Sequence, residues 1–352
     1  MEIISTVVQQ VVAISDSTQV GQARRAASNL AESIGWNERQ IGKLSLIVTE
    51  LSTNIVKHAS SGELLLCPSE SANGNTQIDV IAIDRGPGIS DLSKSLEDGY
   101  STAGSSGTGL GAIRRQADFF EVFSSSGSGT VLLARVASNQ NGSANGGNGH
   151  HVISPDRLQA SFICFPIKGE RVSGDSVAIR VSGCQGMFMV ADGLGHGQDA
   201  AIASLEACKI FAETPEASPR DALENIHSGL RTTRGAAVAV AMIDCDQRVL
   251  KYSGVGNIAG AIVLPEGTRS LVSHNGIIGH QSVRAQEFRY EWPEGGILVM
   301  NSDGLLTNWR LTNYPGILQK DPAILAAVLY RDFSRGRDDL SVLVVRENPS
   351  RA

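Results

Sequence analysis

The segment from Val190 to Gly197 reads VADGLGHG and decides how the C-terminal half of the chain is interpreted. The apolar run at 186–191 predicts a buried strand. Asp192 stands at the end of this strand, and Gly193 begins a turn. An Asp-Gly pair is an ordinary turn when taken by itself. The segment therefore gains meaning only together with the other acidic residues of this half.

Further carboxylates stand at the ends of predicted strands. They are Asp175, Asp303, Asp338 and Asp339. The strands are predicted at 176–181, 186–191, 236–244, 297–301 and 340–346, and the helices at 198–212, 219–231 and 321–332. Carboxylates that gather at one place repel each other unless a cation holds them. Oxygen ligands suit Mg2+ or Mn2+, whereas the five widely spaced cysteines with no CxxC pair disfavour zinc.

In this order, GD, ADGLGHG, SDG and DDLSVLVV resemble the PPM metal-dependent phosphatases, and more narrowly their SpoIIE/RsbX branch, from about residue 151 to residue 346. The resemblance implies an α-β-β-α sandwich in which a metal-activated water attacks phosphorus without a protein nucleophile. It implies two Mn2+ or Mg2+ ions, with the ligands Asp175, Asp192, the Gly193 carbonyl, Asp303 and Asp338. Asp339 takes a place where other members often carry Asn and is added as a candidate metal ligand. For His196 we favour a role in structuring the loop over a role as an acid.

Residues 138–149 read SNQNGSANGGNG, which contains no apolar side chain larger than alanine. Such a stretch cannot offset its ordering entropy by burial, so it predicts a flexible linker. The predicted divisions are a domain at 1–137, a linker at 138–150 and a second domain at 151–352. Both domains are long enough to bury a core.

Composition excludes several classes of protein. The formal net charge is -6 and both signs are scattered, so neither a nucleic-acid partner nor a membrane surface is expected. The N-terminus lacks the pattern of a signal peptide, and apolar runs stay far shorter than the ~18 residues that a membrane span needs. The cysteines are interpreted as reduced and mostly buried. These features predict a cytoplasmic protein.

The N-terminal half alternates helix and strand patterns. Helices are predicted at 17–34 and 109–118, and strands at 77–84 and 129–136. Asn37 to Gln40 resembles a capping box that opens another helix. Glu50 and Asn54 lie four residues apart on that helix and therefore share a face. A polar stripe on an amphipathic helix can also simply face water.

Two glycine-rich segments follow that helix in the sequence. DRGPG at 84–88 comes directly after a strand, where the Asp84 carboxylate can accept a base amino group and Gly86 and Gly88 allow close approach of a ligand. GSSGTGLG at 104–111 opens a helix, and its backbone N–H groups suit a phosphate chain. Its spacing fits neither the dinucleotide fingerprint nor the P-loop.

The ordered set, Glu-x3-Asn, then DRGPGI, then GTGLG, resembles the N, G1 and G2 boxes of the GHKL ATPases, and more closely the RsbT anti-sigma serine kinase branch, over about residues 5–137. The resemblance implies an α/β sandwich that binds ATP with Mg2+. It implies that Glu50 is the catalytic base, that Asn54 binds Mg2+ and that Asp84 contacts adenine. The remaining implied nucleotide contacts are Gly86, Gly88, Gly107, Thr108, Gly109, Leu110 and Gly111.

The predicted elements and the two resemblances assign the chain to the mixed α/β (α+β) class. The preferred hypothesis for its function is a phosphorylation switch with opposed kinase and phosphatase activities. The partner implied by resemblance is a Ser/Thr phosphoprotein, a STAS-domain anti-sigma antagonist or stressosome protein, with a sigma factor or other signalling protein downstream. The alternative is a phosphatase whose N-terminal domain senses nucleotide or docks a partner. A chaperone-like ATPase ranks lower because no transducer domain follows.

Overall fold

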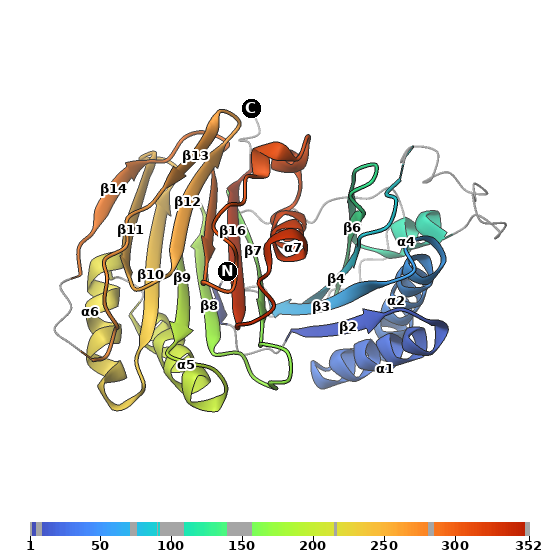
Figure 1. The fold of residues 1–352 in the computed structure, drawn as a ribbon, viewed down its shortest axis with the longest axis horizontal. Helices are drawn as coiled ribbons and strands as arrows, with labels where there is room; N and C mark the ends of the chain where they lie inside the picture. Colours follow the sequence, from blue (N-terminus) through green and yellow to red (C-terminus); the bar gives the residue numbers. More distant parts are fainter. Residues whose placement is uncertain are drawn as a thin grey trace. The chain divides into compact units, whose positions relative to one another are not determined.

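The structure is a computed structural model. It describes residues 2–4, 9–70, 76–89, 91, 109–138, 157–214, 217–280 and 285–348, with the backbone alone described at 2–4, 70 and 109. The described chain forms two compact units, one of Val8–Val152 and one of Met1–Val7 with Ile153–Ala352 (Figure 1). No described helix is both long and apolar enough to cross a membrane.

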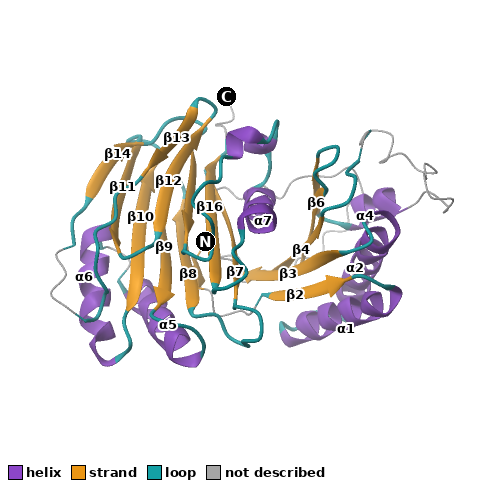
Figure 2. Cartoon of the chain, in the orientation of Figure 1, coloured by secondary structure: helices purple, strands orange, loops and turns teal. Residues whose placement is uncertain are grey.

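In the described part of the first unit, three helices cover one face of a five-stranded antiparallel sheet (Figure 2). The helices are α1 (Ser17–Ser33), α2 (Glu38–His58) and α4 (Gly109–Gln116). The sheet has the order β2-β3-β4-β6-β5, with β2 (Gln10–Ile14), β3 (Gly62–Glu70), β4 (Thr76–Asp84), β5 (Phe119–Ser124) and β6 (Thr130–Ala137). This arrangement is the predicted α/β sandwich.

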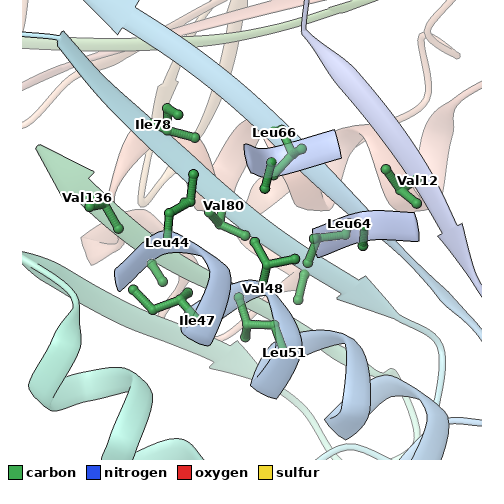
Figure 3. Packing of buried hydrophobic residues seen from close by; sticks show 14 of the residues in the cluster. Val12, Leu44, Ile47, Val48, Leu51, Leu64, Leu66, Ile78, Val80 and Val136 are labelled. Carbon is green, nitrogen blue, oxygen red and sulfur yellow. The ribbon is translucent and has the colours of Figure 1, made fainter. Parts of the chain in front are cut away.

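The core of the first unit lies between the sheet and α2. Leu44, Ile47, Val48 and Leu51 follow one another at helical spacing and are 0 to 1% exposed. They pack against alternate residues of β3 and β4, among them Leu64, Leu66, Ile78 and Val80 (Figure 3). The expected capping box starts α2, because Gln40 N donates to Asn37 Oδ1 at 3.0 Å and Asn37 N donates to Gln40 Oε1 at 2.9 Å. The amphipathic pattern therefore places the polar stripe of α2 away from the core.

The second unit is an α-β-β-α sandwich, as expected. One sheet has the order β1-β8-β9-β10-β11-β14, with β1 (Glu2–Ile4), β8 (Asp175–Ser182), β9 (Gln185–Gly193), β10 (Ala236–Asp244), β11 (Val249–Val255) and β14 (Phe288–Glu291). The other has the order β13-β12-β15-β16-β7, with β7 (Leu158–Phe165), β12 (Ala259–Leu264), β13 (Gly267–Ser270), β15 (Ile297–Asn301) and β16 (Leu340–Glu347).

Helices cover both outer faces of the sandwich (Figure 2). On the first sheet lie α5 (Gln198–Glu213) and α6 (Pro219–Gly229), and on the second lies α7 (Pro322–Phe333). Three 3-10 turns complete the described unit, η1 (Leu230–Thr232), η2 (Leu311–Asn313) and η3 (Ile317–Gln319).

Burial on both faces explains why β9 reads as a continuous apolar run. Phe188 and Val190 lie in the core between the two sheets, whereas Met187, Met189 and Ala191 lie in the core beneath α5 and α6. A strand covered on both faces has no polar side, so its sequence does not alternate.

Several local predictions need correction. The helix predicted at 109–118 ends at Gln116, and Asp118 instead accepts bonds from Lys43 Nζ and Ala137 N. Ser138, placed by composition at the start of the linker, is 4% exposed, and its hydroxyl accepts from Thr76 N at 3.0 Å. Residues 139–150 lie outside the described residues. The first strand, β1, pairs with β8 and so groups with the C-terminal unit. The domain boundaries at 137 and 151 stay predictions.

Candidate functional site

The acidic residues predicted as metal ligands come together at one end of the C-terminal sandwich. Asp175 and Asp192 lie directly opposite each other on β8 and β9. Asp303 follows β15 by two residues, and Asp338 precedes β16 by two. Like charges directly opposite each other in an antiparallel pair destabilise a sheet. The fold therefore carries an electrostatic cost here that a bound cation would remove.

The pKa values of these carboxyls show how strongly they disfavour negative charge. Burial first, and then the charge of Asp192, raises the pKa of Asp175 well above its ordinary value. Burial and the charges of Asp303 and Asp338 raise the pKa of Asp192 to about 7. Desolvation and the charge of Asp303 also raise the pKa of Asp338. The cluster is thus a site of high negative potential.

Glycines let the segments of this site approach one another closely. A Cβ on Gly193 would lie 2.0 Å from the carbonyl oxygen of Ala200 on α5, and one on Gly304 would lie 2.0 Å from the carbonyl oxygen of Asp339. No side chain fits at either position without movement of the backbone. The glycines of ADG and SDG therefore serve packing, whatever role the adjacent aspartates have.

A divalent cation fits the chemistry of this site. Asp175 is 3% exposed, and by distance and angle its Oδ2 accepts no hydrogen bond from the described residues, although the hydroxyls of Ser302 and Ser341 lie near enough to lower the pKa of this carboxyl. A buried carboxylate oxygen without a partner is costly, and a cation would satisfy it. Within the described ranges, no three His, Cys, Asp or Glu side chains form a compact metal cage. Mg2+ commonly keeps several waters and takes only one or two carboxylates, so it does not need such a cage.

Asp339 has different surroundings from the other four. It is 3% exposed, and both of its carboxylate oxygens accept backbone hydrogen bonds. Oδ1 accepts from Ile167 N at 2.7 Å, and Oδ2 accepts from Gly174 N at 2.8 Å. Its proposed role as a metal ligand therefore competes with two short bonds to the loop between β7 and β8.

Two neighbouring side chains complete the described site. His196 is largely exposed, and its Nδ1 lies 3.1 Å from Glu170 Oε1, so it links the segment between β9 and α5 to the β7–β8 loop. Asn257, to which the sequence assigned no chemistry, donates from Nδ2 to Asp303 Oδ2 at 2.8 Å. The preceding Gly256 has a φ of +98° and packs against Ala237. A Gly-Asn turn alone carried no signal for this contact.

In the N-terminal unit, the predicted nucleotide residues lie on α2 and at the end of β4. Glu50 and Asn54 are half-buried on α2, on a different face from the core residues. Asp84 ends β4, and its Oδ1 accepts from Gly86 N at 2.8 Å and Thr130 N at 3.2 Å. These two bonds hold the Asp84 carboxylate in a single orientation.

The loop after Asp84 packs tightly against its surroundings. A Cβ on Gly86 would lie 2.8 Å from the Cβ of Ala59, the residue that follows α2. Gly88 has a φ of +75°, and a Cβ there would lie 2.3 Å from the Ser125 carbonyl oxygen. The DRGPG loop is thus fixed beside the C-terminal end of the helix that carries Glu50 and Asn54. Gly107 and Thr108 lie outside the described residues, and Gly109, Leu110 and Gly111 form the start of α4.

Comparison with protein families gives one match in each half of the chain. The model of the histidine kinase-like ATPase domain matches residues 14–136, and that of stage II sporulation protein E (SpoIIE) matches residues 185–348. Together with the two folds, these matches define the class: a histidine kinase-like ATPase domain joined to a protein-serine/threonine phosphatase domain of the SpoIIE type.

Individual relatives match each half. The serine/threonine-protein kinase RsbT of Bacillus subtilis (strain 168) is 32% identical over 126 residues, which are 36% of this chain and 94% of RsbT. The phosphoserine phosphatase RsbX of the same organism is 24% identical over 141 residues, 39% of this chain and 70% of RsbX. A solved structure described as "The bacterial stressosome: a modular system that has been adapted to control secondary messenger signaling" has a TM-score of 0.50 at 25% identity, covering 54% of this chain and all of that one. The chain belongs, through its N-terminal unit, to the RsbT family.

Proposed function

We propose that this protein is a bifunctional regulator of the partner-switching type, which removes phosphate from Ser or Thr of a partner protein and transfers phosphate from ATP to it. The observation that carries the phosphatase half is the pair Asp175 and Asp192. These two carboxylates are opposite in register, lie in an interior that raises both pKa values, and include a buried oxygen without a partner. Such a pair is stable as a charged site only with a cation.

In this proposal two Mn2+ or Mg2+ ions are held by Asp175, Asp192, the Gly193 carbonyl, Asp303 and Asp338. When bound, such ions lower the pKa of a water molecule and neutralise charge on the phosphate. The chain contributes the ligands, and Asn257 orients the Asp303 carboxylate through its 2.8 Å hydrogen bond. Four carboxylates and one backbone carbonyl, from both sheets, thus bind a phosphate ester only through the cations between them.

For the N-terminal unit we propose the roles implied by the resemblance to the RsbT branch. Glu50 accepts the proton of the substrate hydroxyl, Asn54 holds Mg2+, and Asp84 receives the adenine amino group. The glycine-rich segment that opens α4, from Gly107 to Gly111, binds the phosphates through backbone N–H groups. The position of Asp84 supports its role, because two backbone N–H groups orient its carboxylate before any ligand arrives.

The proposed partner is a small regulatory phosphoprotein, a STAS-domain anti-sigma antagonist or a stressosome component, in the cytoplasm. Support comes from the two relatives, a serine/threonine kinase and a phosphoserine phosphatase of one organism, and from the stressosome structure. Matches to a kinase and to a phosphatase within a single chain are what a reversible phosphorylation switch requires.

The test is phosphate transfer from radiolabelled ATP to candidate STAS-domain proteins. The Asp192→Asn variant is used so that the phosphatase does not erase the product. We expect label on Ser or Thr that disappears when Glu50→Ala is added. ATP binding without transfer would reduce the N-terminal unit to a nucleotide-sensing or docking module. Release of phosphate by Asp192→Asn at the wild-type rate would show that the metal assignment is wrong.

A further inference from the structure

The loop between β7 and β8, residues 166–174, is fastened at both ends by one side chain from a distant part of the chain. Asp339 accepts from Ile167 N near the start of the loop and from Gly174 N at its end, at 2.7 and 2.8 Å. We call this arrangement the Asp339 clamp. Both distances are typical of charge-assisted hydrogen bonds, which are about twice as strong as neutral ones.

The Asp339 clamp is connected through Gly174 to two proposed metal-binding groups, Asp175 and the Gly193 carbonyl. Gly174 precedes Asp175 in the chain, and its carbonyl accepts from Gly193 N at 3.1 Å. Gly174 is thus held on one side by Asp339 and on the other by the residue whose carbonyl is a proposed metal ligand. A Cβ on Gly174 would lie 2.7 Å from Asp339 Oδ2 and 2.9 Å from the Cβ of Ala200, so this junction has no spare space.

The geometry of Asp339 also differs from that of a metal ligand. Each of its oxygens already accepts a backbone N–H, whereas Asp175 Oδ2 has no such partner among the described residues. Asp338, the adjacent residue, is exposed, and its Oδ1 accepts from Asp339 N at 3.0 Å. The two consecutive aspartates therefore have different surroundings, one directed at backbone and one accessible from solvent.

We propose that Asp339 is a positioning residue: it closes the β7–β8 loop onto the start of β16 and thereby sets the places of Asp175 and Gly193, without binding a metal ion itself. The structural part of this proposal rests on the Asp339 clamp alone. Its consequence for metal binding rests on the proposed phosphatase function. Loss of the Asp339 carboxylate loosens the β7–β8 loop. Metal binding weakens as a result, because the ligands remain present but are less well placed.

The test uses the full-length Asp339→Asn variant. Asn keeps the size of the side chain and one acceptor, but it turns the other oxygen into an N–H donor that faces a backbone N–H. Lys168 and Arg171 are exposed in the loop and report its opening through cleavage by trypsin, with the cut sites identified by mass spectrometry. In metal-free protein we expect cleavage at these two sites to become roughly tenfold faster, the factor that loss of one hydrogen bond to a charged group produces.

The second readout is Mn2+ binding, measured by calorimetry together with activity on p-nitrophenyl phosphate. We expect Asp339→Asn to bind as many Mn2+ ions as the wild type. The Mn2+ concentration for half-maximal activity should rise about tenfold, while kcat at saturating Mn2+ falls much less. Asp338→Asn is the matched control, with the opposite pattern of fewer bound ions and unchanged cleavage.

Unchanged cleavage in Asp339→Asn, or the loss of a bound Mn2+ ion from it, overturns the proposal. If this variant does not fold, Gly174→Ala opens the clamp from the loop side and should give the same faster cleavage with the same number of ions. Absence of Mn2+ binding in the wild type would refute the proposed phosphatase site, and the trypsin comparison in metal-free protein would still decide whether the clamp exists.

Discussion

Replacement of Gly193 by alanine tests whether the ADG segment is constrained by packing as well as by chemistry. The added Cβ would lie 2.0 Å from the Ala200 carbonyl oxygen, whereas ordinary contacts begin at 3.4 Å. Helix α5 or strand β9 must therefore move by the difference, about 1.4 Å. The first turn of α5 packs on the sheet with alanines that are at most 3% exposed, so it has no flexible side chain to yield.

Overpacking of a tight core costs about 1–3 kcal/mol, and we expect Gly193→Ala to lie near the upper end because backbone must move. For a unit of this size, about 3 kcal/mol corresponds to a fall in Tm of about 6–12 °C. The assay is calorimetric unfolding of the full-length protein in EDTA, which separates packing from metal binding. Mn2+ affinity is measured in parallel and should also fall.

Gly183→Ala is the matched control, because Gly183 lies in the turn at the other end of the same β8–β9 hairpin. Its φ is +59°, and a Cβ there would have no atom within 4 Å. The variant should therefore cost only the strain of a left-handed alanine, about 1 kcal/mol. A loss of stability in Gly193→Ala that is no larger than in Gly183→Ala would refute the reasoning from close approach.

Three further predictions concern metal, pH and a buried ion network. Mn2+ at about 100 times its Kd should stabilise the protein by about 2.7 kcal/mol. A fixed Mn2+ concentration should stabilise it more at pH 8 than at pH 6, because burial raises the pKa of Asp192 to about 7; equal Tm values with Mn2+ and EDTA would contradict the site. Burial raises the pKa of Tyr252 to about 12 from 10, so its contribution to stability is complete below pH 10 and is lost as pH rises to 12. The loss is about 3 kcal/mol, and urea unfolding of Tyr252→Phe should show a correspondingly weaker pH dependence over that range. Glu347, 4% exposed, accepts from Arg157, from Arg248 Nη1 at 2.6 Å and from Trp292 Nε1 at 3.1 Å. Glu347→Ala should cost about 3 kcal/mol in urea unfolding, and a cost below that of an exposed control such as Glu224→Ala would show that the network does not matter.

Strong local patterns were predictable from the sequence. The amphipathic spacing of Leu44 to Leu51 and the capping box at Asn37 predicted α2, and the structure confirms both. Strand β3 was not predicted, although Leu64, Leu65 and Leu66 are all fully buried. This run of consecutive leucines lacks the alternation of apolar and polar residues on which the prediction depends. The end of α4 was placed two residues too late, because the contact of Asp118 with Lys43 joins positions 75 residues apart.

The sequence by itself determined the class of the protein and predicted candidate residues for its chemistry. Ordered motifs such as ADGLGHG and DDLSVL depend on residue type and spacing, which are visible in one dimension. Only the tertiary structure decided what each acidic side chain faces. Asp338 and Asp339 are adjacent and chemically identical, yet one is accessible to solvent and the other is directed at two backbone N–H groups that lie 172 and 165 residues away. Successive side chains near a strand point to opposite sides, and the partners on each side come from distant segments, so no local pattern distinguishes the two.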